Sequence, residues 1–311
     1  MIEKPMDVLA QFPVRKSKNQ KSAFRDAVVA YAEKLGYSVA VEKGSMGAKN
    51  IVIGNPDSAR YLITAHYDTP ASIGLPNILT PCNPITFLLY QILLVFFFFA
   101  VSIGAAVIAA FLFGSEQATL FAWYVSYFGL LLLMMVGPAN KSNANDNTSG
   151  VVTLLETAAV CPEGTRDQIC FVLFDLEEAG LVGSSSYRKA HKAATEKQIV
   201  LNLDCVGDGD EIVFFLTKKL KKDPEKMDLI RKVNGNSSQK SICVHEKGFS
   251  TYPSDQMNFP YGVGIAAFRR MKSIGLYVDR IHTSRDTILE EENVNYLCDA
   301  LLKLAETSAA E

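Results

Sequence analysis

The stretch YLITAHYDTP (residues 61–70) is followed closely by PITFLLYQILLVFFFFAVSIGAAVIAAFLF (residues 84–113). The first stretch is typical of a buried strand that ends in His66 and Asp68, two residue types that bind metal ions. The second stretch carries no charge and is far more apolar than an ordinary surface helix. The fold must therefore connect a strand end suited to metal chemistry directly to a segment suited to lipid.

The apolar region after this strand divides into two runs. Between Asp68 and Lys141 the only charged residue is Glu116, and it lies in the polar turn GSEQ between residues 85–113 and 118–137. Each run is long enough to cross a bilayer, which takes roughly 20 helical residues. Buried core helices are the alternative, but these normally keep a polar stripe and are shorter. We predict a transmembrane helical hairpin at residues 85–137 that contacts the lipid bilayer, with both ends on one side.

Three observations predict where the rest of the chain lies. The N-terminus MIEKPMDVLAQFPVRK lacks the apolar core of a signal peptide. Lys141 directly follows the second run, which agrees with positive-inside orientation. The six cysteines form no CxxC pair, which is typical of reduced core residues. We therefore expect an integral protein of the cell membrane whose soluble part faces the cytoplasm.

Composition limits the function classes. The chain has 311 residues and 49 % apolar composition, enough for a sizeable core. Its net charge of -2 gives no basic footprint for nucleic acid. We therefore expect no nucleic-acid partner.

The remaining sequence alternates between strand and helix patterns. The predicted strands are NIVIG, YLITAH, QICFVLF, QIVLNLD, EIVFFLT and VGIAAF. The predicted helices are SAFRDAVVAYAEKLGY, SGVVTLLETAAV, GLVGSSSYRKAH and EEENVNYLCDALLKLAE. This alternation predicts an α/β fold with a central sheet flanked by helices. Residues 1–84 and 138–311 would form one domain, and the hairpin at residues 85–137 would be inserted into it.

Polar residues gather at the ends of these predicted strands or just beyond them. They are His66, Asp68, Asp146, Glu177, Glu178, Asp204 and His282. Such strand ends meet in one crevice in α/β enzymes. Histidines combined with carboxylates suit zinc, with manganese or cobalt as alternatives.

Five motifs in this order resemble the co-catalytic di-zinc aminopeptidases, a family related to glutaminyl cyclase and glutamate carboxypeptidase. The motifs are HYD (66–68), DNTSG (146–150), EEAGLVGS (177–184), NLDCVG (202–207) and HTSRDT (282–287). The resemblance covers roughly residues 24–306 once the hairpin is set aside. It implies a zinc-exopeptidase-like mixed sheet and a catalytic domain that binds a peptide substrate.

The resemblance also implies a role for each motif residue. One Zn2+ would be held by His66 and Asp204, the other by Glu178 and His282, and Asp146 would bridge the two. Glu177 would be the general base that activates a metal-bridging water. Asp68 and Asp286 would hold the two histidine rings in the ligating tautomer.

One motif departs from the family pattern. PSDQMNF (residues 253–259) has Gln256 where the family often has a histidine, so substrate preference does not transfer. Tyr252, just before it, is a candidate donor to the oxyanion of the transition state.

The leading function is a membrane-anchored, zinc-dependent metallo-aminopeptidase. The alternatives are other amide chemistry on the same scaffold (endopeptidase, carboxypeptidase or glutaminyl cyclase) and a non-enzymatic membrane scaffold. The sequence leaves open the side-chain preference, the natural substrate, the native metal and the oligomeric state. Only residues 138–145 separate the second run from Asp146, a reach of at most about 30 Å, so we expect the metal site near the membrane face.

Overall fold

The computed structural model describes residues 2–72, 74–233 and 240–309 of the chain. Their centre is a nine-stranded sheet with the order β1-β2-β4-β3-β5-β8-β6-β7, in which β9 pairs with β8. The strands are β1 (Val39–Lys43), β2 (Lys49–Ile53), β3 (Tyr61–His66), β4 (Ile169–Phe174), β5 (Ile199–Leu203), β6 (Glu211–Leu216), β7 (Ser241–His245), β8 (Gly262–Met271) and β9 (Gly275–Tyr277). The prediction of a mixed α/β fold is confirmed, because β3 runs parallel to β4 and β5 whereas β2 runs antiparallel to β4.

The central strands are the ones that the sequence predicts best. β3, β4 and β5 are buried along their whole length, as continuous apolar runs require. β1 and β7 were not predicted, because these end strands of the sheet are partly exposed and polar. An exposed edge strand lacks the apolar run that marks a central one.

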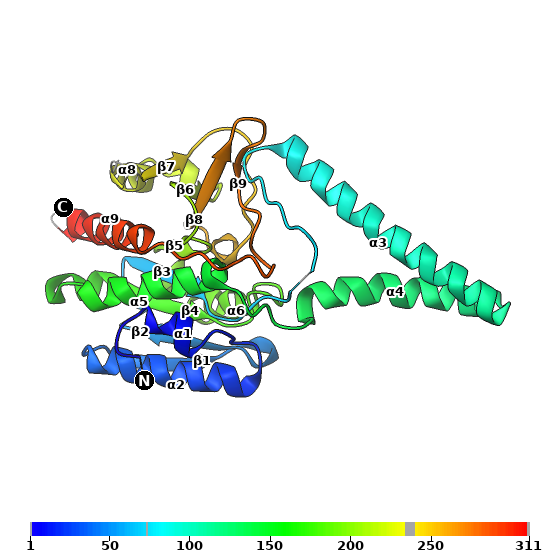
Figure 1. Cartoon of the computed structure of the whole chain (residues 1–311). Coiled ribbons are helices and arrows are strands. Elements are labelled where there is room, and N and C mark those ends of the chain that lie inside the picture. The colour runs from blue at the N-terminus through cyan, green and yellow to red at the C-terminus, as the bar shows by residue number, and fades with distance from the viewer. Residues whose placement is uncertain (1, 73, 234–239, 310–311) are drawn as a thin grey trace.

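Helices cover both faces of the sheet (Figure 1). Besides the hairpin they are α1 (Asp7–Gln11), α2 (Lys18–Lys34), α5 (Gly150–Val160), α6 (Val182–Ala190), α7 (Lys192–Thr195), α8 (Pro224–Lys232) and α9 (Glu291–Ala309). Successive residues of β3 point to opposite faces of the sheet and pack in two different clusters. Ile63 belongs to the large core that α2, α5 and α9 complete, whereas Leu62 belongs to a smaller cluster with Tyr187 of α6.

The start of α2 illustrates local sequence control. The helix begins at Lys18, four residues before the predicted Ser22, because Ser17 and Gln20 form a capping box. The Ser17 hydroxyl accepts from the Gln20 amide, and the Gln20 side chain accepts from the Ser17 amide. Such reciprocal bonds satisfy two helix-end donors and move the boundary outward.

The apolar region forms a helical hairpin that projects from the body (Figure 1). α3 (Pro84–Phe113) begins at an Asn83 cap, and α4 (Glu116–Val136) begins at a Ser115 cap. Gly114 ends α3 in the left-handed conformation, with φ of 57°, which glycine adopts without strain. Both helices are long and apolar enough to cross a membrane.

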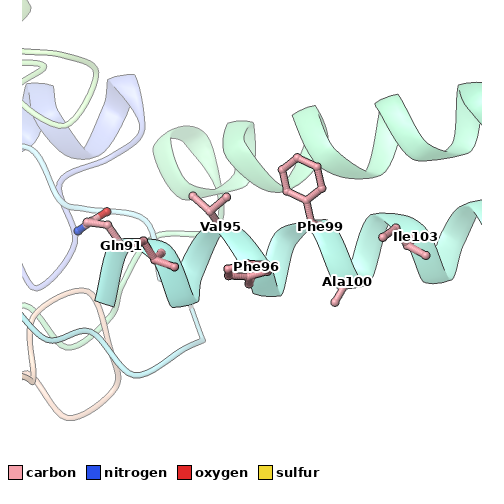
Figure 2. A pocket seen from close by; sticks show the side chains of 7 residues that line it. Gln91, Val95, Phe96, Phe99, Ala100 and Ile103 are labelled. Atoms are coloured by element: carbon pink, nitrogen blue, oxygen red, sulfur yellow. The ribbon is translucent and has the colours of Figure 1, made fainter. Parts of the chain in front are cut away.

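Aromatic side chains hold the two helices together, although most of their surface stays exposed. Phe99 of α3 lies 5.6 Å from Trp123 and 5.2 Å from Tyr127 of α4, measured between ring centroids. Figure 2 shows Phe99 on the side of α3 that faces α4 and Ala100 on the opposite side. Near the tip, Phe111 is 89 % exposed. In the body most large apolar residues are buried, so the hairpin inverts the usual arrangement of a soluble protein.

Two segments join the hairpin to the body. We call residues 74–83, which lead into α3, the strap, and residues 138–145, which follow α4, the return segment. The chain enters and leaves side by side, because Ala71 and Ala139 form an antiparallel bridge. The Ser72 amide donates to the Pro138 carbonyl at 2.8 Å.

Candidate metal centre

Three parallel strands bring the first part of the site together. His66 is the last residue of β3 and pairs with Phe174, the last residue of β4. Glu177 and Glu178 lie in the loop after β4, and Asp204 directly follows β5. These residues meet because the carboxyl ends of neighbouring parallel strands lie at one edge of the sheet.

The other two predicted ligands come from loops. Asp146 directly follows the return segment, ahead of α5. His282 lies in the loop between β9 and α9, with φ of 59°. A non-glycine residue in this region is uncommon, and here it accompanies a ring that reaches the site.

Asp146 lies at the centre of the cluster. Its Oδ1 is 3.4 Å from Nε2 of His66, and its Oδ2 is 3.0 Å from Nε2 of His282. Two overlapping groups share it, one with His66 and Asp204 and the other with Glu178 and His282, and each group has ligand atoms within 4.8 Å of one another. The structure thus brings all five predicted ligands together, with one Asp146 oxygen toward each histidine.

Asp68 supports the loop that carries the two glutamates. Its carboxylate accepts hydrogen bonds from the backbone amides of Glu177 at 3.0 Å and Glu178 at 3.2 Å. Nδ1 of His66 lies 3.2 Å from the Asp68 carbonyl and 3.6 Å from its carboxylate. A proton on Nδ1 would leave Nε2 free to bind a metal, which is the orientation that such partners impose.

Asp286 lies elsewhere than expected. It was predicted to hold the His282 ring, but its carboxylate accepts from the backbone amides of Asn145 at 2.8 Å and Asp146 at 3.0 Å. Among the described residues, Nδ1 of His282 is buried without a hydrogen-bond partner. Asp286 therefore fixes the backbone of the central carboxylate, because two consecutive amides attract one buried carboxylate strongly.

The electrostatics of the site are those of a crowded acidic pocket. Burial, and then the nearby negative charges of Asp146 and Asp68, raise the pKa of Glu178 to about 8. Burial also raises the pKa of Glu177 well above its usual range. Burial opposes protonation of His282, but the charge of Glu178 and the hydrogen bond to Asp146 outweigh it and raise the His282 pKa to about 9.

These residues fit a pair of divalent cations. Four carboxylates and two imidazoles crowd one pocket. The raised pKa values of Glu177 and Glu178 show that these two carboxylates need nearby positive charge to stay ionised. Nitrogen and oxygen donors of this kind are the set that zinc binds. The residues present therefore match the metal that the sequence resemblance implies.

The cluster opens into a pocket of about 270 Å³. Tyr252 lines this pocket, but its hydroxyl donates to the Asp204 carbonyl at 2.9 Å. The hydroxyl that was predicted to stabilise the oxyanion is therefore already hydrogen-bonded to the segment that carries Asp204. Gln256 is buried and donates to the Tyr252 carbonyl, so it supports that residue from behind.

Two supporting groups were not singled out from the sequence. Arg15 is fully buried and donates to the Tyr67 carbonyl and to the Thr148 hydroxyl, which ties together the chain beside Asp68 and beside Asp146. Burial lowers its pKa to about 10, which leaves it charged at neutral pH. Asp208 is buried and its carboxylate pairs with Arg280 at 2.9 Å, and Arg280 lies two residues before His282. Single charged residues far apart in sequence give no pattern from which to predict either contact.

Comparison with known proteins gives one family match. The profile of a family described as "Peptidase family M28" matches residues 132–300, which includes α5, β4, β5 and the whole ligand set except His66. Aminopeptidase YwaD of Bacillus subtilis is 30 % identical over an alignment 136 residues long, which covers 38 % of this chain. That match spans only 29 % of the relative's length.

Solved structures match over nearly the whole chain. Glutaminyl cyclase of Porphyromonas gingivalis has a TM-score of 0.59 at 17 % identity, covering 98 % of this chain and 96 % of that one. LapA aminopeptidase of Legionella pneumophila has a TM-score of 0.61 at 16 % identity, covering 99 % and 72 %. A zinc-dependent exopeptidase of Parabacteroides distasonis has a TM-score of 0.57 at 15 % identity, covering 97 % and 94 %. At these identities the likeness shows that the fold is shared.

Proposed function

The chain belongs to peptidase family M28, and on that premise we propose that it is a membrane-anchored aminopeptidase that uses two zinc ions. Family membership supports a metallopeptidase. The aminopeptidase specificity, the metal count, the role of each site residue and the membrane anchor are the parts that we propose.

The position of Asp146 carries the proposal. Its two carboxylate oxygens lie toward different histidines, at 3.4 Å from His66 and 3.0 Å from His282. A carboxylate placed in this way is the shared ligand that a two-metal site requires. We assign His66 and Asp204 to one ion, Glu178 and His282 to the other, and Asp146 to both.

Glu177 is the proposed general base. It lines the same pocket and lies beside the ligand Glu178, while Asp68 fixes its backbone amide. Burial raises the pKa of Glu177, so its carboxylate, once ionised by the positive charge of bound cations, would accept a proton more readily than an exposed glutamate. Glu177 takes a proton from the attacking water and delivers it to the departing amine nitrogen. When bound, the zinc ions would polarise the scissile carbonyl and acidify that water.

The rest of a peptide has room beside the pocket. A second cavity of about 500 Å³ shares Tyr252 and Pro253 with the metal-site pocket. Lys218 and Lys219 line this second cavity. Their positive charge suits the C-terminal carboxylate of a short peptide, which would place the N-terminal residue in the metal-site pocket.

The hairpin is the proposed membrane anchor. Its exposed face is apolar along both helices, and a cavity of about 590 Å³ beside α3 is lined by apolar residues such as Val95 and Phe96 (Figure 2). An apolar surface of this extent is stable against lipid rather than water. Because both ends of the hairpin return to the body, the catalytic domain lies on one side, which we propose to be the cytoplasmic side.

The test separates the base from the ligands. Glu177→Gln should keep its zinc and lower kcat on a dipeptide by about 10²- to 10⁴-fold, the usual worth of a positioned proton-transfer group. Glu178→Gln is the matched variant, and it should lose zinc. Zinc content is measured by elemental analysis on protein in lipid discs. Full activity of Glu177→Gln would remove this residue from the mechanism.

Peptides that begin with glutamine test the glutaminyl cyclase alternative in the same assay. Hydrolysis releases free glutamine, whereas cyclisation releases ammonia and leaves the peptide otherwise intact. We expect free glutamine. Ammonia without free amino acid would identify a cyclase, and no product from any peptide would favour a non-enzymatic scaffold.

A further inference from the structure

The strap passes from the body to α3 along the metal-site pocket. Asn77 and Leu79 of the strap line this pocket together with the predicted ligands. The segment that introduces the hairpin is therefore also a wall of the substrate pocket. This arrangement was not visible in the sequence, where residues 74–83 carry no histidine, aspartate or glutamate.

Hydrogen bonds fix the strap in this position. Leu79 pairs with Val278 through both backbone groups, at 2.9 and 3.0 Å. The Asn77 side chain donates to the Ile281 carbonyl at 3.2 Å, beside His282. The strap is thus attached to the loop that carries one of the predicted ligands, so its side chains keep a defined distance from the reacting bond.

Apart from Asn77, whose side chain is bonded to the Ile281 carbonyl, the wall around Leu79 is apolar. Ile281 and Pro253 line the same pocket, and Leu79 packs against the buried cluster that contains Tyr252 and Val278. The other side of the pocket is polar, because the carboxylates and histidines of the candidate metal site line it. The pocket of about 270 Å³ therefore has a polar side for the peptide bond and an apolar side for one side chain.

We propose that Leu79 of the strap is a specificity-determining residue that selects peptides whose N-terminal side chain is apolar and of leucine size. This inference rests on the proposed aminopeptidase function. Leu79 contacts the side chain of the residue whose carbonyl is attacked. Charged side chains are disfavoured because the apolar wall of Leu79, Ile281 and Pro253 offers them no partner once they lose water.

The strap also connects this contact to the hairpin. The phenol of Tyr90, in the second turn of α3, donates to the Pro76 carbonyl at 2.8 Å. The membrane helix therefore contacts the strap one residue before Asn77. Selection of the side chain and anchoring in the membrane depend on the same ten residues.

The test compares four dipeptides, Leu-Ala, Phe-Ala, Ala-Ala and Lys-Ala, on the full chain in lipid discs. Wild type should prefer Leu-Ala over Lys-Ala by at least about 10-fold in kcat/KM, the scale of hydrophobic selection by one pocket. Leu79→Ala should lower kcat/KM for Leu-Ala by about 10-fold and shift preference toward Phe-Ala. Leu79→Phe should shift preference toward Ala-Ala, because it narrows the pocket.

Leu75→Ala is the matched control. Leu75 lies on the same strap but lines a cavity at the base of the hairpin instead of the metal-site pocket. It should leave the ranking of the dipeptides unchanged, and zinc content should be unchanged in every variant. Equal losses for all four dipeptides in Leu79→Ala and Leu79→Phe would overturn the role of Leu79 while peptide hydrolysis stands. If wild type hydrolyses none of them, the proposed function itself fails.

Discussion

The strap and the return segment join the same hairpin to the same body, yet they differ in almost every respect. The return segment is rich in asparagine, and Asn140, Asn143 and Asn145 are all buried. The strap is mostly half-buried or exposed, and its side-chain hydrogen bonds are made one or two at a time by Asn77, Thr80, Cys82 and Asn83. One segment ends at the central carboxylate of the site, and the other ends at the apolar helix α3.

The difference between the two segments indicates that the catalytic site requires a more exact position of the return segment than of the strap. Asn143 alone donates to two backbone carbonyls and accepts from the Thr148 hydroxyl. Such a network fixes Asp146 closely, as a site built on short distances requires. The strap only has to present one apolar side chain, so it tolerates a looser attachment.

The largest effect should come from the end of the return segment. Asp146→Ala removes the ligand that both predicted ions share, so we expect loss of most zinc and a fall in kcat of at least about 10³-fold, as when a catalytic unit is dismantled. Elemental analysis and dipeptide hydrolysis measure the two quantities. The exposed Asp299→Ala on α9 should change neither. A variant that keeps two zinc ions per chain would show that Asp146 is not the bridge.

The next effect compares the two segments directly. Asn143→Ala removes three buried hydrogen bonds, so it should lower zinc affinity by about 10- to 100-fold, the usual cost of losing a residue that supports a ligand. Asn77→Ala on the strap removes one bond from a half-buried side chain and should leave zinc affinity nearly unchanged. Zinc titration in competition with a chelator gives both values. Equal effects would contradict the contrast between the segments.

A third effect comes from protons that compete with the metal. The pKa of His282 is raised to about 9 and that of Glu178 to about 8 in the metal-free protein. Both groups hold protons below these values and must release them to bind a cation, so apparent zinc affinity should rise with pH from 6 toward 9. The slope is about 10-fold per pH unit for each proton released. Affinity that falls or stays constant across this range would remove these two residues from the ligand set.

The smallest effect should come from the contact between α3 and the strap. Tyr90→Phe removes only the hydroxyl that donates to the Pro76 carbonyl, a hydrogen bond worth roughly 0.5–1.5 kcal/mol. Zinc content should not change, whereas kcat/KM for Leu-Ala should fall by a few-fold, because the strap is less firmly held. No change in the ranking of dipeptides would mean that the strap keeps its position without the helix.

The sequence predicts the members of the carboxylate and histidine cluster better than the residues that support them. His66, Glu178 and Asp204 follow continuous apolar runs, and parallel strands bring such ends together whatever the loops do. Asp286 was assigned to the wrong contact because its partners are the backbone amides of Asn145 and Asp146. Every residue type except proline carries a backbone amide, so the sequence does not indicate which amide a carboxylate will bind. The strap escaped prediction for a related reason: its place beside the pocket depends on the bridge between Leu79 and Val278, which only the folded sheet creates.

The bridge between Ala71 and Ala139 has a practical consequence for making a soluble form of the protein. Because the chain leaves and re-enters the body at adjacent points, a short turn between these residues would close the gap without disturbing β3 or the return segment. That shortest excision also removes residues 74–83, and Leu79 with them. Truncation nearer Asn83 would keep the pocket wall but require a linker long enough to reach back to Pro138. The choice of cut would therefore decide whether a crystallisable fragment reports the side-chain preference of the whole protein or that of a pocket open on one side.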